Sequence, residues 1–323
     1  MSVKRLVELF NRVSTDEKVP ETWKKGIIVK LPKKEDLSQC GNWRCIKHED
    51  INREIISRCI NLLSVPGKIF CRVKLNRIKS SIDKVLREEQ VGFTEGRSCT
   101  GQIFVLRIII EQFLEWNSSI YVNFIDFKKA FDSVHHDTLW KILQLYGVPQ
   151  KIINILSNMY ADNLCCVRHG EQHSEWFTVK SGVRKGCVIS PILFQLVIDW
   201  VMKKSTAQKA RGITWKAFNH LEDDGFADDI VLLSHSCKDM QKTTQIEMHA
   251  KTVGLKINHT KCKIMRVNAN TATGVQMNNK VLENVNEFKY LGSYLNADED
   301  INREITSRIA MASIAFQRLN AIW

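Results

Sequence analysis

The chain has 323 residues, 44% of them hydrophobic, which is ordinary for a globular protein and enough to bury a sizeable core. Its formal net charge of +12 and pI near 9.2 favour a polyanionic partner, although a basic globular protein without such a partner would share these values. The sequence has neither the apolar run of a signal peptide nor the roughly 18 apolar residues of a membrane span. We therefore expect an intracellular protein, nuclear or cytoplasmic, without a membrane partner.

The ten cysteines and nine histidines are scattered along the chain. No two cysteines have the C-x-x-C spacing, and no histidine completes a zinc-binding pattern. This scatter is typical of reduced, partly buried thiols in an intracellular protein. It argues against a disulfide framework and against a structural zinc site.

Hydrophobic periodicity predicts the elements of the first half of the chain. Residues 100–116 have apolar side chains at helical spacing and form an amphipathic helix entered through Ser98 or Thr100. The apolar run 120–127 is typical of a buried strand. The other elements expected up to residue 179 are a strand at 26–31, a helix whose start is 66–78, helices at 137–146 and 150–160, and a hairpin of 164–168 with 176–179.

In the second half, Ser190-Pro191 begins a helix whose apolar body is 192–202. Residues 226–233 are apolar on both sides of two aspartates, which is the pattern of a tight hairpin. A helix is expected at 238–253, and strands are expected at 262–267, 275–277 and 280–282. Helices thus alternate with mostly antiparallel strands, which predicts an α+β fold.

One decapeptide occurs twice. Residues 49–58 read EDINREIISR and residues 299–308 read EDINREITSR, so nine of the ten positions are identical. The single recurrence does not have the period of a solenoid. It indicates either a duplicated helical element or an accident of gene assembly.

Three carboxylates are candidates for metal binding. Asp126 ends an apolar strand, where an unpaired charge is costly, and Asp228-Asp229 lies at the tip of the apolar hairpin. If the two strands are neighbours in one sheet, the three carboxylates converge at one edge and offer the hard oxygen ligands that Mg²⁺ prefers. Two such ions, about 3.5–4 Å apart, promote in-line phosphoryl transfer. The alternative for two adjacent aspartates is a solvated loop.

A series of boxes then resembles one known family. Phe226-Ala227-Asp228-Asp229 resembles the aromatic-x-Asp-Asp box of reverse transcriptases, and the segment 124–134 resembles the first catalytic box of their non-LTR (LINE-like) subgroup. The remaining boxes occur in the family's order over roughly residues 18–320. They are Asn42-Trp43-Arg44, 62–68, Gln90-Val91-Gly92-Phe93 with Gly96-Arg97-Ser98, Gly182 to Pro191, Gly254 to Asn258 with Lys261, and the primer-grip box Phe288 to Gly292.

The resemblance implies the polymerase of a non-LTR (LINE-like, RTE-type) retrotransposon with a right-hand fold. Residues 1–120 would form the fingers, 121–295 the palm with its antiparallel sheet, and 296–323 the start of a truncated thumb. Residues 47–60, which contain the first copy of the decapeptide, would be an insertion in the fingers. The implied activity is RNA-directed DNA synthesis by two-metal phosphoryl transfer, from an RNA template, a DNA primer and deoxynucleoside triphosphates.

The resemblance also implies residue roles. Asp126, Asp228 and Asp229 would bind two Mg²⁺ ions, for which Mn²⁺ could substitute. The Phe127 carbonyl would assist them. Lys261 would act as a general acid that protonates the departing pyrophosphate, although a lone lysine is more often a solvated surface residue.

Four further residues would contact the nucleotide. Phe131 would lie under the sugar and reject ribonucleotides, with core packing as the alternative. Arg97 would bind the triphosphate, with a surface salt bridge as the alternative. Gly186 would permit close approach of the backbone to the template and the nucleotide, and Lys185 would face the nucleotide.

This chain departs from the family pattern in several places. Lysine occupies position 185, where the family has glutamine, and Asp224-Gly225 introduces a charge and a flexible residue into a strand that is normally apolar. These departures leave open a second interpretation, a catalytically inactive nucleic-acid-binding remnant of such a polymerase. A different palm-fold enzyme, such as a nucleotide cyclase, is a third; the basic fingers and the Lys261 box argue against it.

Overall fold

The computed structural model describes residues 3–29, 60–94, 96–206, 211–215, 219–240, 242–269, 274–277, 280–298 and 300–319. These residues form two compact units. The first unit combines Met1–Arg87, Lys128–Val201 and His249–Lys256, and the second combines Glu88–Phe127, Met202–Met248 and Ile257–Trp323. The box at residues 42–44 and residues 47–59 of the expected insertion lie outside the described residues.

The first unit is built on a sheet in the order β2-β1-β4-β5, with β6 also paired to β4. Strand β1 (Lys25–Val29) pairs antiparallel with β2 (Ile60–Leu62) and parallel with β4 (Leu164–His169). The short strands β5 (Gln172–His173) and β6 (Phe177–Thr178) both turn back antiparallel on β4. Ile60, the last residue of the expected insertion, therefore belongs to a sheet strand and pairs with Val29.

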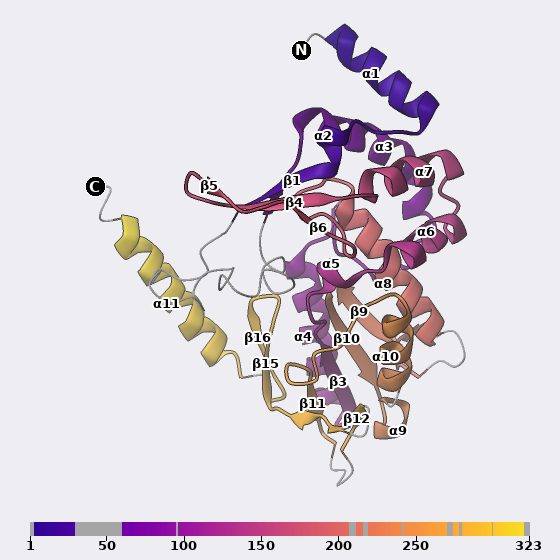
Figure 1. Cartoon of the computed structure of the whole chain (residues 1–323). Coiled ribbons are helices and arrows are strands. Elements are labelled where there is room, and N and C mark those ends of the chain that lie inside the picture. Colours follow the sequence, from indigo (N-terminus) through magenta and orange to yellow (C-terminus); the bar gives the residue numbers. More distant parts are fainter. Residues whose placement is uncertain are drawn as a thin grey trace. The chain divides into compact units, whose positions relative to one another are not determined.

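Most helices of this unit gather at the end of the sheet that lies away from β5 (Figure 1). The helices of the unit are α1 (Val3–Asp16), α2 (Glu21–Lys24), α3 (Val65–Asp83), α5 (Ala130–Ser133), α6 (His136–Leu145), α7 (Gln150–Tyr160) and most of α8 (Ser190–Thr206). The Ser64 side chain caps α3 by accepting a hydrogen bond from Gly67 N, and Pro66 lies in the first turn. Trp23 and Phe10 both pack on the buried Phe70 ring, with centroids 5.4 and 5.3 Å away. This aromatic cluster joins three helices.

The second unit is built on a five-stranded sheet in the order β14-β11-β3-β10-β9. Strand β3 (Ile120–Ile125) is central and completely buried, and it lies antiparallel to β10 (Asp229–Ser234) and to β11 (Lys263–Val267). Strand β9 (Asp223–Phe226) pairs antiparallel with β10, and β14 (Glu283–Asn284) pairs parallel with β11. The expected Asp-Asp hairpin is thus β9 followed by β10.

Helix α4 (Cys99–Glu115) covers one face of this sheet (Figure 1). Its N-cap is Ser98, whose hydroxyl accepts a hydrogen bond from Gly101 N at 3.3 Å. The helix buries Leu106, Ile109, Ile110 and Phe113 against alternate residues of the strands, among them Val122, Phe124, Val231, Leu233 and Met265. This apolar layer fixes β3 beside β10 and so fixes the two aspartate-bearing strand ends side by side.

The rest of the second unit consists of short hairpins and helices. They are β7 (Ile213–Trp215) with β8 (Asn219–Leu221), β12 (Gln276–Met277) with β13 (Lys280–Val281), β15 (Glu287–Tyr290) with β16 (Ser293–Asn296), α9 (Cys237–Met240), most of α10 (Lys242–Thr252), and α11 (Asn302–Leu319). Helix α11 contains the second copy of the decapeptide from Asn302 onward and keeps apolar side chains such as Ile309 and Phe316 exposed.

The structure confirms the predicted α+β class and most predicted elements. The expected hairpin after α7 has β5 as an additional strand, because β4 extends to His169 and also pairs with Gln172–His173. The division into fingers, palm and thumb at residues 120 and 295 remains a prediction. Among the described residues, every helix is too short or too polar to cross a membrane.

Candidate active site

Two strand ends bring the candidate carboxylates together. In the antiparallel register of β3 and β10, Ile125 pairs with Ile230. The next step along the same register places Asp126 opposite Asp229. Asp229 also pairs with Phe226 across the β9–β10 hairpin, so Ala227 and Asp228 form the turn between them. The sheet therefore gathers Asp126, Asp228 and Asp229 at one edge although about a hundred residues separate the first from the others.

The segment after Gly254 attaches Lys261 to the same edge. Phe127 forms an isolated bridge with Ile257, and Asn258 N donates to the Asp126 carbonyl oxygen at 2.8 Å. Lys261 N in turn donates to the Asn258 carbonyl oxygen at 2.9 Å. This turn directs the Lys261 side chain to Asp126, with 3.4 Å between Nζ and Oδ1.

The carboxylates influence one another. Asp229 has an exposed surface, but many atoms crowd round its carboxyl group. This partial burial, together with the charges of Asp228 and Asp126, raises the pKa of Asp229 to about 6. The Lys261 ammonium partly opposes the rise in pKa. Asp126, Asp229 and Lys261 border a cavity of about 340 Å³, whose walls also include Lys263 and Lys289. Carboxylates and lysines thus line the same cavity.

The donor set fits a hard divalent cation. Asp126 Oδ2 is buried and has no hydrogen-bond partner among the described residues, which is a costly state that a cation would relieve. Neighbouring carboxylates that resist joint ionisation are also a typical cation site. Within the described ranges, no three His, Cys, Asp or Glu side chains are drawn close enough to form a ready-made metal cage.

The Gly-rich box lies in the first unit, where its residues 182–187 contact the last residues of the first catalytic box. Gly182 N donates to the Val134 carbonyl at 2.8 Å, and Val183 N donates to the Phe131 carbonyl at 2.6 Å. Gly182 has φ of +86°, and a Cβ there would lie 2.6 Å from Asp132 Cα. Only glycine permits this approach, so the residue type follows from the close contact between the two boxes.

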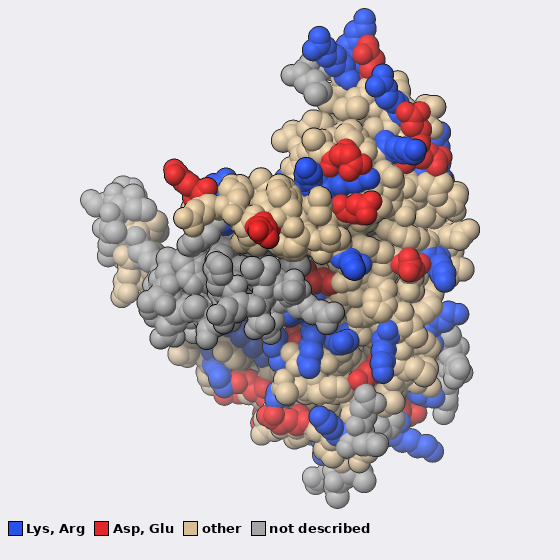
Figure 2. Space-filling view, in the orientation of Figure 1, with Lys and Arg blue, Asp and Glu red and all other residues tan. Residues whose placement is uncertain are grey.

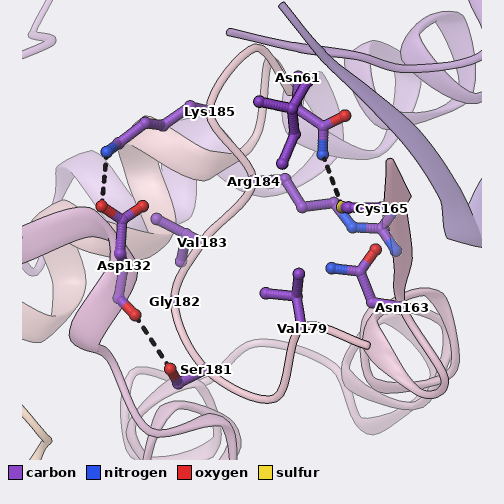
Figure 3. A pocket seen from close by; sticks show the side chains of 11 residues that line it. Asn61, Asp132, Asn163, Cys165, Val179, Ser181, Gly182, Val183, Arg184 and Lys185 are labelled. Carbon is purple, nitrogen blue, oxygen red and sulfur yellow. Dashed lines mark hydrogen bonds and ion pairs between the residues drawn. The ribbon is translucent and has the colours of Figure 1, made fainter. Parts of the chain in front are cut away.

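Lys185 forms an ion pair within this contact. Its Nζ lies 2.7 Å from Asp132 Oδ2, and both side chains are mostly buried, with 23% and 13% of their surface exposed. Figure 3 shows the two side chains pointing toward each other across the rim of a pocket that Asn61 and Arg184 also line. Burial raises the pKa of Asp132, while the charge and hydrogen bond of Lys185 lower it. Lys185 O also accepts a hydrogen bond from Asn61 N at 2.8 Å, which ties the box to β2.

The other predicted nucleotide contacts occupy different surroundings. Phe131 is half-buried and stacks on Phe194 of α8, with 4.2 Å between ring centroids and 20° between planes. Gly186 has φ of +99°, in the region that glycine readily adopts. Arg97 belongs to the second unit and is exposed, and its guanidinium has no salt bridge among the described residues. The role of Arg97 stays a prediction.

Comparison with known proteins supplies the family. The sequence pattern of "Reverse transcriptase (RNA-dependent DNA polymerase)" matches residues 31–295, which is most of the chain. The chain belongs to the reverse transcriptase family. Proteins of this family generally use divalent metal ions.

Relatives of this reverse transcriptase chain come from mobile elements. It is 24% identical over 302 residues to the transposon TX1 uncharacterized 149 kDa protein of Xenopus laevis, covering 90% of this chain and 22% of that protein. It is 28% identical over 207 residues to the Pol polyprotein of element R2DM of Drosophila melanogaster, covering 64% and 19%. It is 27% identical over 262 residues to the polymerase of element jockey of Drosophila funebris, covering 77% and 28%. These are non-LTR elements, as expected, and the RTE subtype remains a prediction.

Solved structures confirm the right-hand polymerase fold. Apo telomerase of Candida tropicalis, truncated from its C-terminal domain, superposes with a TM-score of 0.54 at 17% identity, over 90% of this chain and 58% of that one. Telomerase of Candida albicans, in complex with a fragment of telomeric RNA, superposes with a TM-score of 0.52 at 12% identity, over 90% and 48%. The chain spans about a fifth of the length of the first two mobile-element proteins.

Sequence reasoning gave no role to two side chains that the structure places at the boxes of this reverse transcriptase. Asp132 lies inside the first catalytic box and pairs with Lys185. Gln90 lies inside the box Gln90-Val91-Gly92-Phe93 and is 3% exposed. The sequence marked each only as a polar residue inside a recognised box, and the low exposure that demands a partner is visible only in the structure.

Proposed function

We propose that this chain is the polymerase core of a non-LTR retrotransposon protein and extends a DNA primer on an RNA template from deoxynucleoside triphosphates. The convergence of Asp126 and Asp229 beside Lys261 at one sheet edge carries the proposal. This constellation suits phosphoryl transfer, where catalysis is mostly positioning and charge stabilisation.

Asp126, Asp228 and Asp229 would hold the divalent ions, with the Phe127 carbonyl as a further oxygen. When bound, two Mg²⁺ ions would stabilise the attacking and leaving oxygens of the in-line displacement. In the transfer itself, the primer 3′ oxygen bonds to the α-phosphorus, the bond to pyrophosphate breaks, and the hydroxyl proton passes to solvent. Lys261 donates a proton to the departing pyrophosphate.

Phe131, Lys185 and Gly186 of the first unit and Arg97 of the second would contact the nucleotide. Phe131 would lie against the sugar, and its stacking on Phe194 would keep the ring from yielding to a 2′-hydroxyl. Lys185 and Gly186 would lie beside the base pair or the triphosphate, and Arg97 would contribute a fork-shaped donor for phosphate oxygens.

Net charge supports the nucleic-acid partners. The chain has 47 Lys and Arg against 35 Asp and Glu. Figure 2 shows basic and acidic side chains interspersed over the face that it draws. The excess of basic residues favours contacts to the phosphates of nucleic acid and predicts binding that weakens as salt rises.

Primer extension tests the proposal. The purified chain is given a DNA primer annealed to an RNA template, the four deoxynucleotides and Mg²⁺. Asp126→Asn and Asp229→Asn should each slow extension by at least about a hundredfold, or about 2.7 kcal/mol in the barrier, while template–primer affinity stays within about twofold. Asp298→Asn removes an exposed carboxylate of the same unit and serves as the matched control.

Two outcomes would overturn the proposal. Substantial extension by Asp126→Asn would mean that other carboxylates do the chemistry. Tight template binding by the parent chain without extension would support the alternative, a catalytically inactive remnant.

A further inference from the structure

Residues 89–92 run beside the edge strand β9 of the second unit. Gly225 N donates to the Glu89 carbonyl at 3.1 Å, and Val91 N donates to the Gly225 carbonyl at 3.0 Å, which makes Gln90 and Gly225 a parallel bridge. Strand β9 is the last in the sheet order, so this segment covers an edge that would otherwise be open. The segment therefore lies beside the hairpin whose turn carries Asp228 and leads into Asp229.

The Gln90 side chain binds the backbone of the turn. Its Oε1 accepts from Ala227 N at 3.2 Å and from Gly92 N at 3.1 Å, and its Nε2 donates to the Ala227 carbonyl at 3.3 Å. One carboxamide thus satisfies both backbone groups of Ala227, the residue directly before Asp228. A carboxamide can donate and accept at once, whereas a carboxylate only accepts and an apolar side chain does neither.

Ala227 is a residue that needs such support. Its φ is +58°, a left-handed conformation that residues with a Cβ rarely adopt. The Gly92 backbone lies close against Ala227, because a Cβ at position 92 would be 2.2 Å from Ala227 N. The strained turn is therefore held by surrounding contacts, and strain of this kind persists only where the surroundings impose it.

We propose that Gln90 is a positioning residue that locks the Ala227 turn and thereby fixes Asp228 and Asp229 in the geometry that binds a divalent cation. The proposal rests on the proposed function, since it assumes that these two carboxylates bind the ion. Without the carboxamide, Ala227 N and O lose their partners and the turn can relax to negative φ, which reorients Asp228.

Gln90→Met tests the proposal, because methionine has nearly the same length and volume but makes none of the three hydrogen bonds. The matched control is Gln102→Met, which removes another buried amide of the same unit, one that bonds Asp224 of β9 and not the turn. Mn²⁺ binding to the metal-free chain is measured by electron paramagnetic resonance, amide hydrogen exchange is measured at residues 227–229, and single-nucleotide extension is measured on a template–primer.

Gln90→Met should weaken Mn²⁺ binding by about tenfold, speed exchange of the Ala227 amide by at least about tenfold, and lower kcat by about ten- to a hundredfold. Its KM for the deoxynucleotide should stay within about twofold. Gln102→Met should lower the melting temperature and leave Mn²⁺ affinity unchanged.

Equal Mn²⁺ affinity and equal exchange in a folded Gln90→Met protein would overturn the proposal, as would equal losses in the two variants. If the methionine variant does not fold, Gln90→Asn keeps the amide on a stem too short to reach Ala227 and must show the same changes. A parent chain that does not extend primers, yet shows the contrast in Mn²⁺ binding and exchange, would refute the polymerase activity and leave this inference standing.

Discussion

Lys185 and Asp132 form an ion pair with 2.7 Å between Nζ and Oδ2, and it joins the Gly-rich box to the end of the first catalytic box. Lysine at position 185 is a departure from the family pattern, and the structure gives this lysine a partner within its own unit. The positive charge of Lys185 is therefore largely neutralised by the Asp132 carboxylate, which is itself poorly solvated.

The pair predicts a stability effect. Lys185→Gln leaves the Asp132 carboxylate with less compensation for its burial, so the free energy of unfolding should fall by about 1–3 kcal/mol. Lys185→Gln combined with Asp132→Asn should recover much of that loss, because two neutral amides need no countercharge. Chemical denaturation of the four proteins measures the coupling. Lys180→Gln, at an exposed position of the same unit, is the control, and additive effects in the cycle would show that the pair contributes nothing.

Asp224 predicts a pH effect. It is 4% exposed in β9, and burial together with Asp223 and Glu89 raises its pKa to about 7. A folded pKa above the unfolded value gives stability that is complete below about pH 4 and is lost as pH rises through 7. The loss is on the order of 4 kcal/mol, at about 1.4 kcal/mol for each pKa unit.

Asp224→Asn should remove that loss. It keeps an oxygen that can accept from the Gln102 amide and cannot ionise, so the variant should melt higher than the parent at pH 8 and similarly at pH 4. Thermal unfolding between pH 4 and 8 measures the difference, with the exposed Asp298→Asn as control. A parent whose melting temperature stays level from pH 6 to pH 8 would contradict a buried, protonated Asp224.

The sheet edge that carries Asp126 and Asp229 could be predicted from sequence, because two apolar strands with charged ends have few other arrangements. The α4 face could be predicted for the same reason, since its apolar spacing fits a helix alone. The Lys185–Asp132 pair could not be predicted, because 53 residues separate the partners and local pattern does not determine which charges meet. The Gln90–Ala227 contact depends on a left-handed alanine, which no propensity favours. Asp224 was noted as unusual, but its burial follows only from its register on β9.

Phe131 predicts a change in sugar selectivity. Phe131→Ala should open room for a 2′-hydroxyl and raise ribonucleotide incorporation relative to deoxyribonucleotide by at least about tenfold. The loss of the stack on Phe194 should also cost about 1–3 kcal/mol of stability, so the assay belongs below the melting temperature. Phe131→Leu retains most of the bulk and should discriminate better than the alanine variant. Selectivity that is unchanged in a folded alanine variant would reduce Phe131 to a core residue.

Substitution of Lys261 should lower kcat, whereas substitution of the neighbouring Lys263 should not. Its Nζ is 3.4 Å from Asp126 Oδ1, so two roles are possible: a proton donor to pyrophosphate, or a counter-ion for Asp126. Lys261→Met should lower kcat by about a hundredfold, as for a general acid, with a smaller effect on the deoxynucleotide KM. Lys261→Arg separates the roles, because a guanidinium keeps the charge and cannot release a proton, and it should remain nearly as slow as the methionine variant.

Lys263→Met changes a lysine on the wall of the same cavity that pairs with Glu283, and it should extend primers within about threefold of the parent. Single-turnover rates on one template–primer decide between the roles, since full activity of Lys261→Arg would make Lys261 a counter-ion and not an acid.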